Sequence, residues 1–185
     1  MKKHKMTLKS LNINKSWTLF LDRDGVINKK LDNDYVKDWS FFEFIDGVQD
    51  AMKILNGKFG TIVVVTNQQG IGKGLYRTED LALIHKNMLY EINYLGGRID
   101  KVYFSPYLDS LNHPTRKPGT GMGLAAKKDF PEIDFEKSII VGDSITDMQF
   151  GRALGMKTVF ISGEKRNDAA IDFNFPSLVE FSLNI

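Results

Sequence analysis

Three aspartates and one lysine are the residues of this sequence whose types and spacing point most directly to chemistry. Asp22 and Asp24 lie two residues apart, directly after a short apolar stretch. In an extended chain, residues two apart point to the same side, so both carboxylates would face one site. One carboxylate can act as a nucleophile while the other works as an acid and base. Asp143 and Lys117 lie far from this pair in the sequence and need the fold to join it.

Three carboxylates that meet at one site repel one another unless a cation lies between them. Hard oxygen ligands favour Mg²⁺. An anionic nucleophile that attacks an anionic phosphate also needs positive charge nearby, which Mg²⁺ and Lys117 would supply, while Thr66 and the N–H groups after it could hold phosphoryl oxygens. The residue types therefore indicate phosphoryl transfer.

Short apolar segments alternate with helical patterns along the chain, which predicts the elements that position these residues. The expected strands are 17–21, 61–65, 101–104, 138–141 and 158–161, and the expected helices are 48–55, 78–95, 119–128, 144–154 and 176–181. The strand segments are rich in Val, Ile, Phe and Leu, as is typical of strands buried on both faces. This alternation predicts an α/β fold with a Rossmann-like, doubly wound parallel sheet in three layers.

The carboxyl ends of the strands form the edge where ligands bind in such a sheet. Asp22 follows the first predicted strand, Thr66 and Asn67 follow the second, and Asp143 follows the fourth. Lys117 precedes the third crossover helix. We therefore expect these side chains to converge at one edge.

Ser144 and Asp147 allow two interpretations. Ser144 followed three residues later by Asp147 resembles a capping box at a helix start. Asp147 could equally orient Lys117 or a water on the metal, and the two roles are compatible.

Four sequence motifs together resemble those of the haloacid dehalogenase-like phosphatases. They are Asp-Arg-Asp-Gly-Val-Ile from Asp22, Val-Val-Thr-Asn ending at Asn67, Lys117-Pro118, and Gly-Asp-Ser-Ile-Thr-Asp ending at Asp147. They occur in that order and span most of the chain. The resemblance implies a Mg²⁺-dependent phosphomonoester hydrolase, and segments 25–45 and 106–116 are too short for the cap domains common in this superfamily.

The resemblance also implies a role for each residue. Asp22 would form an aspartyl-phosphate, and Asp24 would protonate the leaving oxygen and then activate water. Mg²⁺ would bind the Asp22 and Asp143 carboxylates and the Asp24 backbone carbonyl. The remaining implied roles are phosphate binding by Thr66, Asn67 and Lys117, substrate binding by Arg23, Gln68, Gln69 and Arg116, and support by Ser144 and Asp147.

Within the superfamily, the motifs look most like those of the heptose bisphosphate and histidinol-phosphate phosphatases. Many members of that group carry a zinc loop of three cysteines and one histidine before the Arg-Lys-Pro motif. This chain has no cysteine, and only His113 in that region is a zinc ligand, so no zinc is expected. His85 and His113 are otherwise isolated histidines, for which packing roles are the default.

Composition and charge limit the remaining possibilities. The chain has 185 residues with 42% hydrophobic and 26% charged side chains, ordinary values for one globular domain. Residues 1–15 carry five lysines and no acid, which predicts a basic N-terminal tail before a single domain over 16–185. That domain has a net charge of −3, so no nucleic-acid partner is expected. No signal peptide or membrane segment is recognised, and we expect a cytoplasmic, monomeric protein acting on a small phosphorylated metabolite.

Three alternatives to a sugar bisphosphate phosphatase remain open at this point. One is a histidinol-phosphate phosphatase. Another is a nucleic-acid 3′-phosphatase, because the segments around Gln68 and Lys117 also resemble the phosphatase half of polynucleotide kinase–phosphatases. The third is a receiver-like signalling domain that holds a phospho-aspartate, although its acceptor ends the third strand, where this chain has Ser105.

Overall fold

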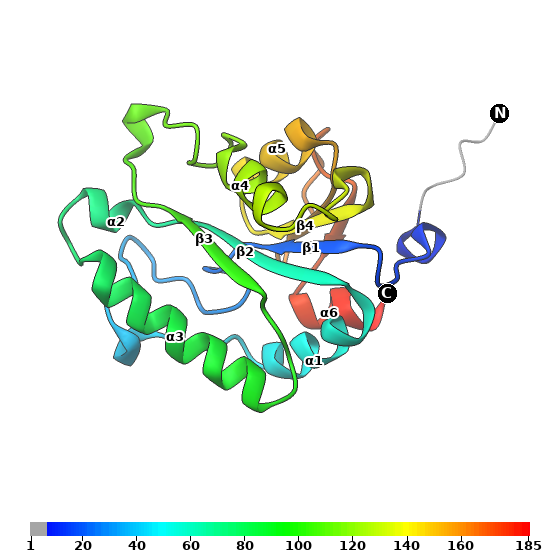
Figure 1. Ribbon diagram of the computed structural model, residues 1–185, viewed down its shortest axis with the longest axis horizontal. Helices are drawn as coiled ribbons and strands as arrows, with labels where there is room; N and C mark the ends of the chain where they lie inside the picture. The colour runs from blue at the N-terminus through cyan, green and yellow to red at the C-terminus, as the bar shows by residue number, and fades with distance from the viewer. Residues whose placement is uncertain (1–6) are drawn as a thin grey trace.

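A six-stranded parallel sheet forms the centre of the protein (Figure 1). The computed structural model describes residues 7–185. The strand order is β3-β2-β1-β4-β5-β6, with every pair parallel. The strands are β1 (Thr18–Leu21), β2 (Thr61–Asn67), β3 (Lys101–Ser105), β4 (Ser138–Gly142), β5 (Lys157–Ile161) and β6 (Phe173–Phe175). The predicted parallel sheet is confirmed, and it has a sixth strand, β6, in addition to the five that the sequence predicted.

Helices cover both faces of the sheet and give the three predicted layers. One face carries α1 (Val48–Lys58), α3 (Thr78–Tyr94) and α6 (Leu178–Leu183), and the other carries α4 (Gly121–Asp129) and α5 (Ile145–Leu154) (Figure 1). A short helix that the sequence did not indicate, α2 (Gln69–Gly72), follows β2. None of the helices in residues 7–185 has the length and apolarity needed to cross a membrane.

Side chains alternate between two hydrophobic cores along the central strands. Leu19 and Leu21 of β1 pack with the core under α1, α3 and α6, whereas Phe20 packs with the core under α4 and α5. All three side chains are fully buried. Burial on both faces explains why the strands read as continuous apolar runs rather than as alternating ones.

The register of the sheet brings the polar residues to one edge. Leu21 at the end of β1 is level with Val64 of β2 and with Val141 of β4. The residues that follow these positions are therefore at similar heights. Asp22 directly follows Leu21, and Thr66 and Asp143 follow two residues after Val64 and Val141.

The described part of the chain carries no separate cap domain. The segment between β1 and α1 is a flap that contains the 3₁₀ turn η2 (Trp39–Phe41). Trp39 stacks on Phe42 with ring centroids 4.8 Å apart, and Phe42 is 9% exposed. Phe42 belongs to the core under α1, α3 and α6, with Trp39 packed against it, so aromatic packing fixes the flap to the body.

Residues 7–15, the described part of the predicted basic tail, lie against the body. Leu8, in the 3₁₀ turn η1 (Leu8–Leu11), is 5% exposed and belongs to the core under α1, α3 and α6. The Lys15 ammonium donates to the carbonyl oxygen of Phe59 over 3.0 Å. Residues 7–15 therefore pack on the body of the protein through Leu8 and Lys15, while residues 1–6 of the predicted tail lie outside the described residues.

Replacing Leu8 tests whether this packing contributes to stability. We expect Leu8→Ala to lower the free energy of unfolding by about 2–4 kcal/mol, because it removes a buried side chain from the core. Urea unfolding measures the change, and Lys9→Ala on the exposed side of the same turn is the matched control. A loss for Leu8→Ala no larger than that of the control would show that the segment does not contribute.

Candidate active site

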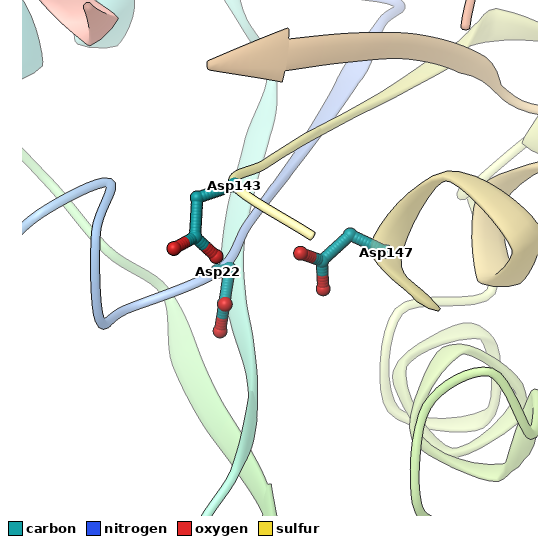
Figure 2. Close-up of side chains that lie close together, drawn as sticks. All are labelled: Asp22, Asp143 and Asp147. Carbon is teal, nitrogen blue, oxygen red and sulfur yellow. The ribbon is translucent and has the colours of Figure 1, made fainter. Parts of the chain in front are cut away.

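Three carboxylates meet at the carboxyl edge of β1 and β4. Figure 2 shows Asp22 directly after β1, Asp143 directly after β4, and Asp147 on the first turn of α5, with their side chains close together. One carboxylate oxygen from each lies within 4.8 Å of the others. Among the described residues this is the group of acidic side chains suited to holding a metal ion.

Lys117 balances the negative charge from within the protein. Its side chain is 1% exposed, and Nζ lies 3.0 Å from Oδ1 of Asp22 and 2.5 Å from Oδ1 of Asp147. Burial alone lowers the pKa of Lys117, but the charges of Asp147 and Asp22 outweigh it and hold that pKa above its ordinary value. The two carboxylates therefore favour the charged form of Lys117.

Asp147 occupies a fixed position because its two oxygens have different partners. Oδ1 faces Lys117, and Oδ2 accepts from the Ser144 hydroxyl over 2.6 Å and from the Ser144 backbone N–H over 3.0 Å. Asp147 is fully buried. The capping box and the contact with Lys117 thus coexist, as the sequence allowed.

Asp143 depends on a glycine for its position. A Cβ on Gly25 would lie 2.3 Å from Oδ2 of Asp143, and Gly25 also has φ of +85°, which favours glycine. The Lys30 ammonium donates to Oδ2 over 2.8 Å, whereas the buried Oδ1 has no hydrogen-bond partner. Burial raises the pKa of Asp143, and Lys30 opposes this increase.

The environments of Asp24 and Asp22 shift the pKa values of the two carboxyl groups in opposite directions. The Asp24 carboxylate accepts hydrogen bonds of 2.9 Å from Arg23, Asn28 and Gln68. Burial raises its pKa, but the Arg23 charge and these bonds outweigh burial and hold the pKa of Asp24 below its usual value. For Asp22, burial outweighs the charge of Lys117 and raises its pKa to about 7.

Thr66 and Asn67 lie at the end of β2, where phosphate binding was predicted. Thr66 is 1% exposed, and its hydroxyl accepts from Gln68 over 2.8 Å. The Asn67 side chain donates to the carbonyl oxygen of Lys117 and accepts from the Lys117 N–H, each over 3.0 Å. The side-chain amide of Asn67 therefore holds Lys117 in place. Only the backbone of Asn67 is left to bind a phosphate.

Two of the four predicted substrate-binding side chains, Arg23 and Gln68, are buried and hydrogen-bonded to other residues of the site. Arg23 and Gln68 are 1% and 2% exposed. Arg23 is bonded to Asp24, Gln68 and His85, and Gln68 is bonded to Asp24, Thr66 and Tyr76. These bonds hold both side chains beside Asp24, and both residues also line the pocket, so substrate contact by Arg23 and Gln68 stays a prediction.

Gln69 and Arg116 are the other two predicted substrate-binding residues. Both line a pocket of about 460 Å³, together with the carboxylates and Lys117. Gln69 is partly exposed at the start of α2, and Arg116 pairs with Asp109 over 3.1 Å. These two side chains therefore stay candidates for contact with substrate.

The loop before Lys117 is held by polar and aromatic contacts at the place where a zinc loop was considered. The His113 ring stacks on Tyr107 with centroids 3.5 Å apart, and its Nδ1 lies 2.8 Å from the Thr115 hydroxyl. The Thr115 hydroxyl lies 3.2 Å from that of Ser105. These contacts connect the loop to the end of β3.

Four residues of the site were not singled out for it by the sequence. Asn28 and Lys30 contact Asp24 and Asp143 from the flap, and Tyr76 and His85 contact Gln68 and Arg23 from beneath. His85 lies on the buried face of α3, so its spacing indicated only packing. No local sequence pattern predicted the contacts of Asn28, Lys30 and Tyr76.

Removal of the Lys117 charge should destabilise the metal-free protein. We expect Lys117→Met to lower the free energy of unfolding by about 3–5 kcal/mol at pH 8, because it leaves two buried carboxylates without their cation. Urea unfolding in EDTA measures the change. Lys30→Met removes an exposed cation from Asp143 and is the matched control, with an expected loss below about 1 kcal/mol. Equal losses for the two variants would contradict the central role of Lys117.

Comparison with known proteins agrees with this geometry. The family profile described as polynucleotide kinase 3 phosphatase matches residues 18–182. The D-glycero-alpha-D-manno-heptose-1,7-bisphosphate 7-phosphatase of Mycobacterium bovis is 37% identical over 91% of each chain. The corresponding beta-heptose enzyme of Rhodopseudomonas palustris is 36% identical over 78% of this chain and 83% of its own.

Solved structures show the same fold. The D,D-heptose 1,7-bisphosphate phosphatase of B. bronchiseptica, complexed with magnesium and phosphate, superposes with a TM-score of 0.81. It is 24% identical and covers 90% of this chain and 96% of its own. The predicted resemblance is thereby confirmed: the chain belongs to the polynucleotide kinase 3 phosphatase family and is a haloacid dehalogenase-like phosphatase of the heptose bisphosphate phosphatase group.

Proposed function

We propose that the protein is a Mg²⁺-dependent phosphomonoesterase that removes the 7-phosphate of a D-glycero-D-manno-heptose 1,7-bisphosphate through an aspartyl-phosphate. The observation that carries the proposal is the contrast between the two aspartates after β1. Asp22 faces Lys117 at 3.0 Å, while Asp24 is turned to Arg23, Asn28 and Gln68. Two carboxylates in different environments are suited to different roles.

The proposed reaction has two steps. An Asp22 carboxylate oxygen attacks phosphorus, the bond from phosphorus to the sugar oxygen breaks, and that oxygen takes a proton from Asp24. A water molecule then attacks the phosphorus of the aspartyl-phosphate and gives a proton to Asp24. Inorganic phosphate leaves with its bond to Asp22 broken, so both carboxyl groups return to their starting states.

Mg²⁺ fits the donor set of the site. Asp22 and Asp143 each offer a carboxylate oxygen within 4.8 Å of the other, and the buried Oδ1 of Asp143 has no other partner. We assign the Asp24 backbone carbonyl as a further ligand. Asp147 is left to Lys117, because both of its oxygens have partners within the protein. When bound, the ion supplies the positive charge that lets an anionic nucleophile approach a phosphate.

The lining of the pocket supports a substrate with a second anionic group. Lys30, Lys73 and Arg116 line the pocket in addition to the buried Arg23 and Lys117. Thr66 and the backbone of Asn67 are assigned to the reacting phosphate. Gln69 and Arg116 are assigned to the distal part of the substrate. The relatives above include enzymes for both anomers, so the anomer is left to the assay.

A nucleic-acid 3′-phosphatase is the second candidate, because the matching family profile carries that description. The charge of the chain opposes it, since the 170 residues after the first 15 carry a net charge of −3. A phosphate backbone is bound by clustered basic side chains. We further propose that the protein acts on a small metabolite, that it is a monomer in the cytoplasm and that it needs no zinc.

A substrate panel tests the proposal. It contains both heptose 1,7-bisphosphate anomers, histidinol phosphate and a 3′-phosphorylated oligonucleotide, each assayed for phosphate release with Mg²⁺. We expect one heptose anomer to exceed the other classes by about 100-fold in kcat/KM, a difference of about 2.7 kcal/mol. Asp22→Asn should abolish release while circular dichroism shows the fold intact.

Other results of the panel would change the assignment. A preference for the oligonucleotide that declines steeply with salt would favour the 3′-phosphatase. Substantial release by Asp22→Asn would remove Asp22 as nucleophile. An aspartyl-phosphate that persists for minutes in the unaltered protein would favour the receiver-like alternative.

Metal removal gives a prediction that does not depend on substrate. Because Mg²⁺ would bind two carboxylates that otherwise repel, we expect added Mg²⁺ to raise the melting temperature of EDTA-treated protein by several degrees. Activity should disappear with EDTA and return with Mg²⁺ alone. In Asp143→Asn the thermal shift should be lost, and an unchanged shift in that variant would contradict the assigned ligands.

A further inference from the structure

A buried histidine lies beneath the predicted acid and takes no part in the reaction as written above. His85 is on the inner face of α3, is 8% exposed, and packs edge to face against Phe104 of β3 with ring centroids 6.3 Å apart. Its Nε2 lies 3.2 Å from Nη1 of Arg23. A packing role alone would be served by an apolar side chain, so the contact between His85 and Arg23 needs its own explanation.

The chemistry of the contact fixes which atom donates. An arginine side chain carries only donors, so Nε2 of His85 must be the acceptor and the ring must be neutral. Burial, together with the Arg23 charge, lowers the pKa of His85 to about 3, in agreement with a neutral ring. His85 therefore presents a lone pair to Arg23.

Arg23 links this lone pair to Asp24. Its Nη2 donates to Oδ1 of Asp24 over 2.9 Å and to Oε1 of Gln68 over 3.3 Å, while Nη1 is directed to His85. Arg23 is 1% exposed, so water does not offer replacement partners. A planar guanidinium with acceptors on both terminal nitrogens has its orientation fixed.

We propose that His85 is a positioning residue, which acts through Arg23 to hold the Asp24 carboxylate in the orientation needed to protonate the leaving oxygen. This inference rests on the proposed role of Asp24 as the acid. Nε of Arg23 is already buried without a hydrogen-bond partner. Without the acceptor at His85, Nη1 would lose its partner as well, and the guanidinium would be held only through Nη2. The hydrogen bond between Arg23 and Asp24 then loses its direction.

A pair of substrates with different leaving groups reports on Asp24 directly. p-Nitrophenolate leaves without a proton, whereas phenolate from phenyl phosphate benefits from one. Because kcat/KM covers the first step only, the ratio of kcat/KM for p-nitrophenyl phosphate to that for phenyl phosphate rises when the acid is misplaced. General loss of structure lowers both values and leaves the ratio unchanged.

The experiment compares three variants with the unaltered enzyme in Mg²⁺. Asp24→Asn gives the ratio expected when the acid is absent. His85→Phe keeps an aromatic ring but has no acceptor. We expect it to raise the ratio about tenfold, which is part of the roughly 10²–10⁴-fold rate increase that a well-placed general acid supplies. His85→Gln places an amide oxygen where it can accept from Arg23, and its ratio should stay within about twofold of the unaltered enzyme, since the acceptor is retained.

The outcomes separate the inference from the function on which it rests. If Asp24→Asn leaves the ratio unchanged, Asp24 is not the acid. Both the proposed role of Asp24 and the inferred role of His85 are then overturned. If Asp24→Asn raises the ratio but His85→Phe does not, only the role of His85 is overturned. Equal increases for His85→Phe and His85→Gln would also overturn it, because the acceptor would not matter.

A fourth variant, Arg23→Lys, provides the test if His85→Phe does not fold. Arg23→Lys keeps the positive charge but cannot reach Asp24, Gln68 and His85 with a planar fork. We expect it to raise the same ratio about tenfold, because the direction of the bond to Asp24 is lost and not the charge. An unchanged ratio in a folded Arg23→Lys enzyme would overturn the inference.

Discussion

The buried ammonium of Lys117 is the interaction on which the rest of the site depends. It lies between Asp22 and Asp147, and neither carboxylate could stay buried and ionised at this edge without a cation. The fold therefore fixes Lys117 from several directions. Asn67 holds its backbone from the end of β2, and Ser144 holds Asp147 at the start of α5. Three separate strand ends thus position one charge.

The same edge gives its two neighbouring aspartates opposite properties. Burial among other carboxylates raises the pKa of Asp22 to about 7, whereas Arg23 and two further donors hold the pKa of Asp24 below its usual value. A divalent cation bound by Asp22 would favour the charged form of this carboxylate, which the proposed nucleophile needs. In the proposed mechanism Asp24 needs its proton only when a phosphate arrives, and the negative charge of that phosphate favours protonation.

The sequence predicted the sheet and the convergence of carboxylates because both follow from periodic or directly chemical signals. Apolar runs marked the strands, and the residues after them were necessarily at one edge. It did not predict what individual side chains do within the site. Substrate contact by Arg23 and Gln68 stays a prediction, but their hydrogen bonds to Asp24 depend on side-chain direction, which no periodicity records. The packing of Leu8 on the body was not predicted either, because one leucine among lysines forms no apolar pattern.

The parts of the molecule that select the substrate are also the parts that the sequence describes least well. With no cap domain over the described residues, the pocket opens between the flap after β1 and the loop before Lys117. The proposed reaction uses aspartates at the ends of β1 and β4 together with the buried Lys117. Under the proposed function, discrimination between substrates would come from Lys30, Lys73, Gln69 and Arg116, which lie on the flap, on α2 or beside it, and on the loop. In this chain the loop is held by a Tyr107–His113 stack and hydroxyl contacts, and Arg116 pairs with Asp109 of the same loop. Substrate choice can therefore change through loop residues that leave the chemistry of the strand ends intact.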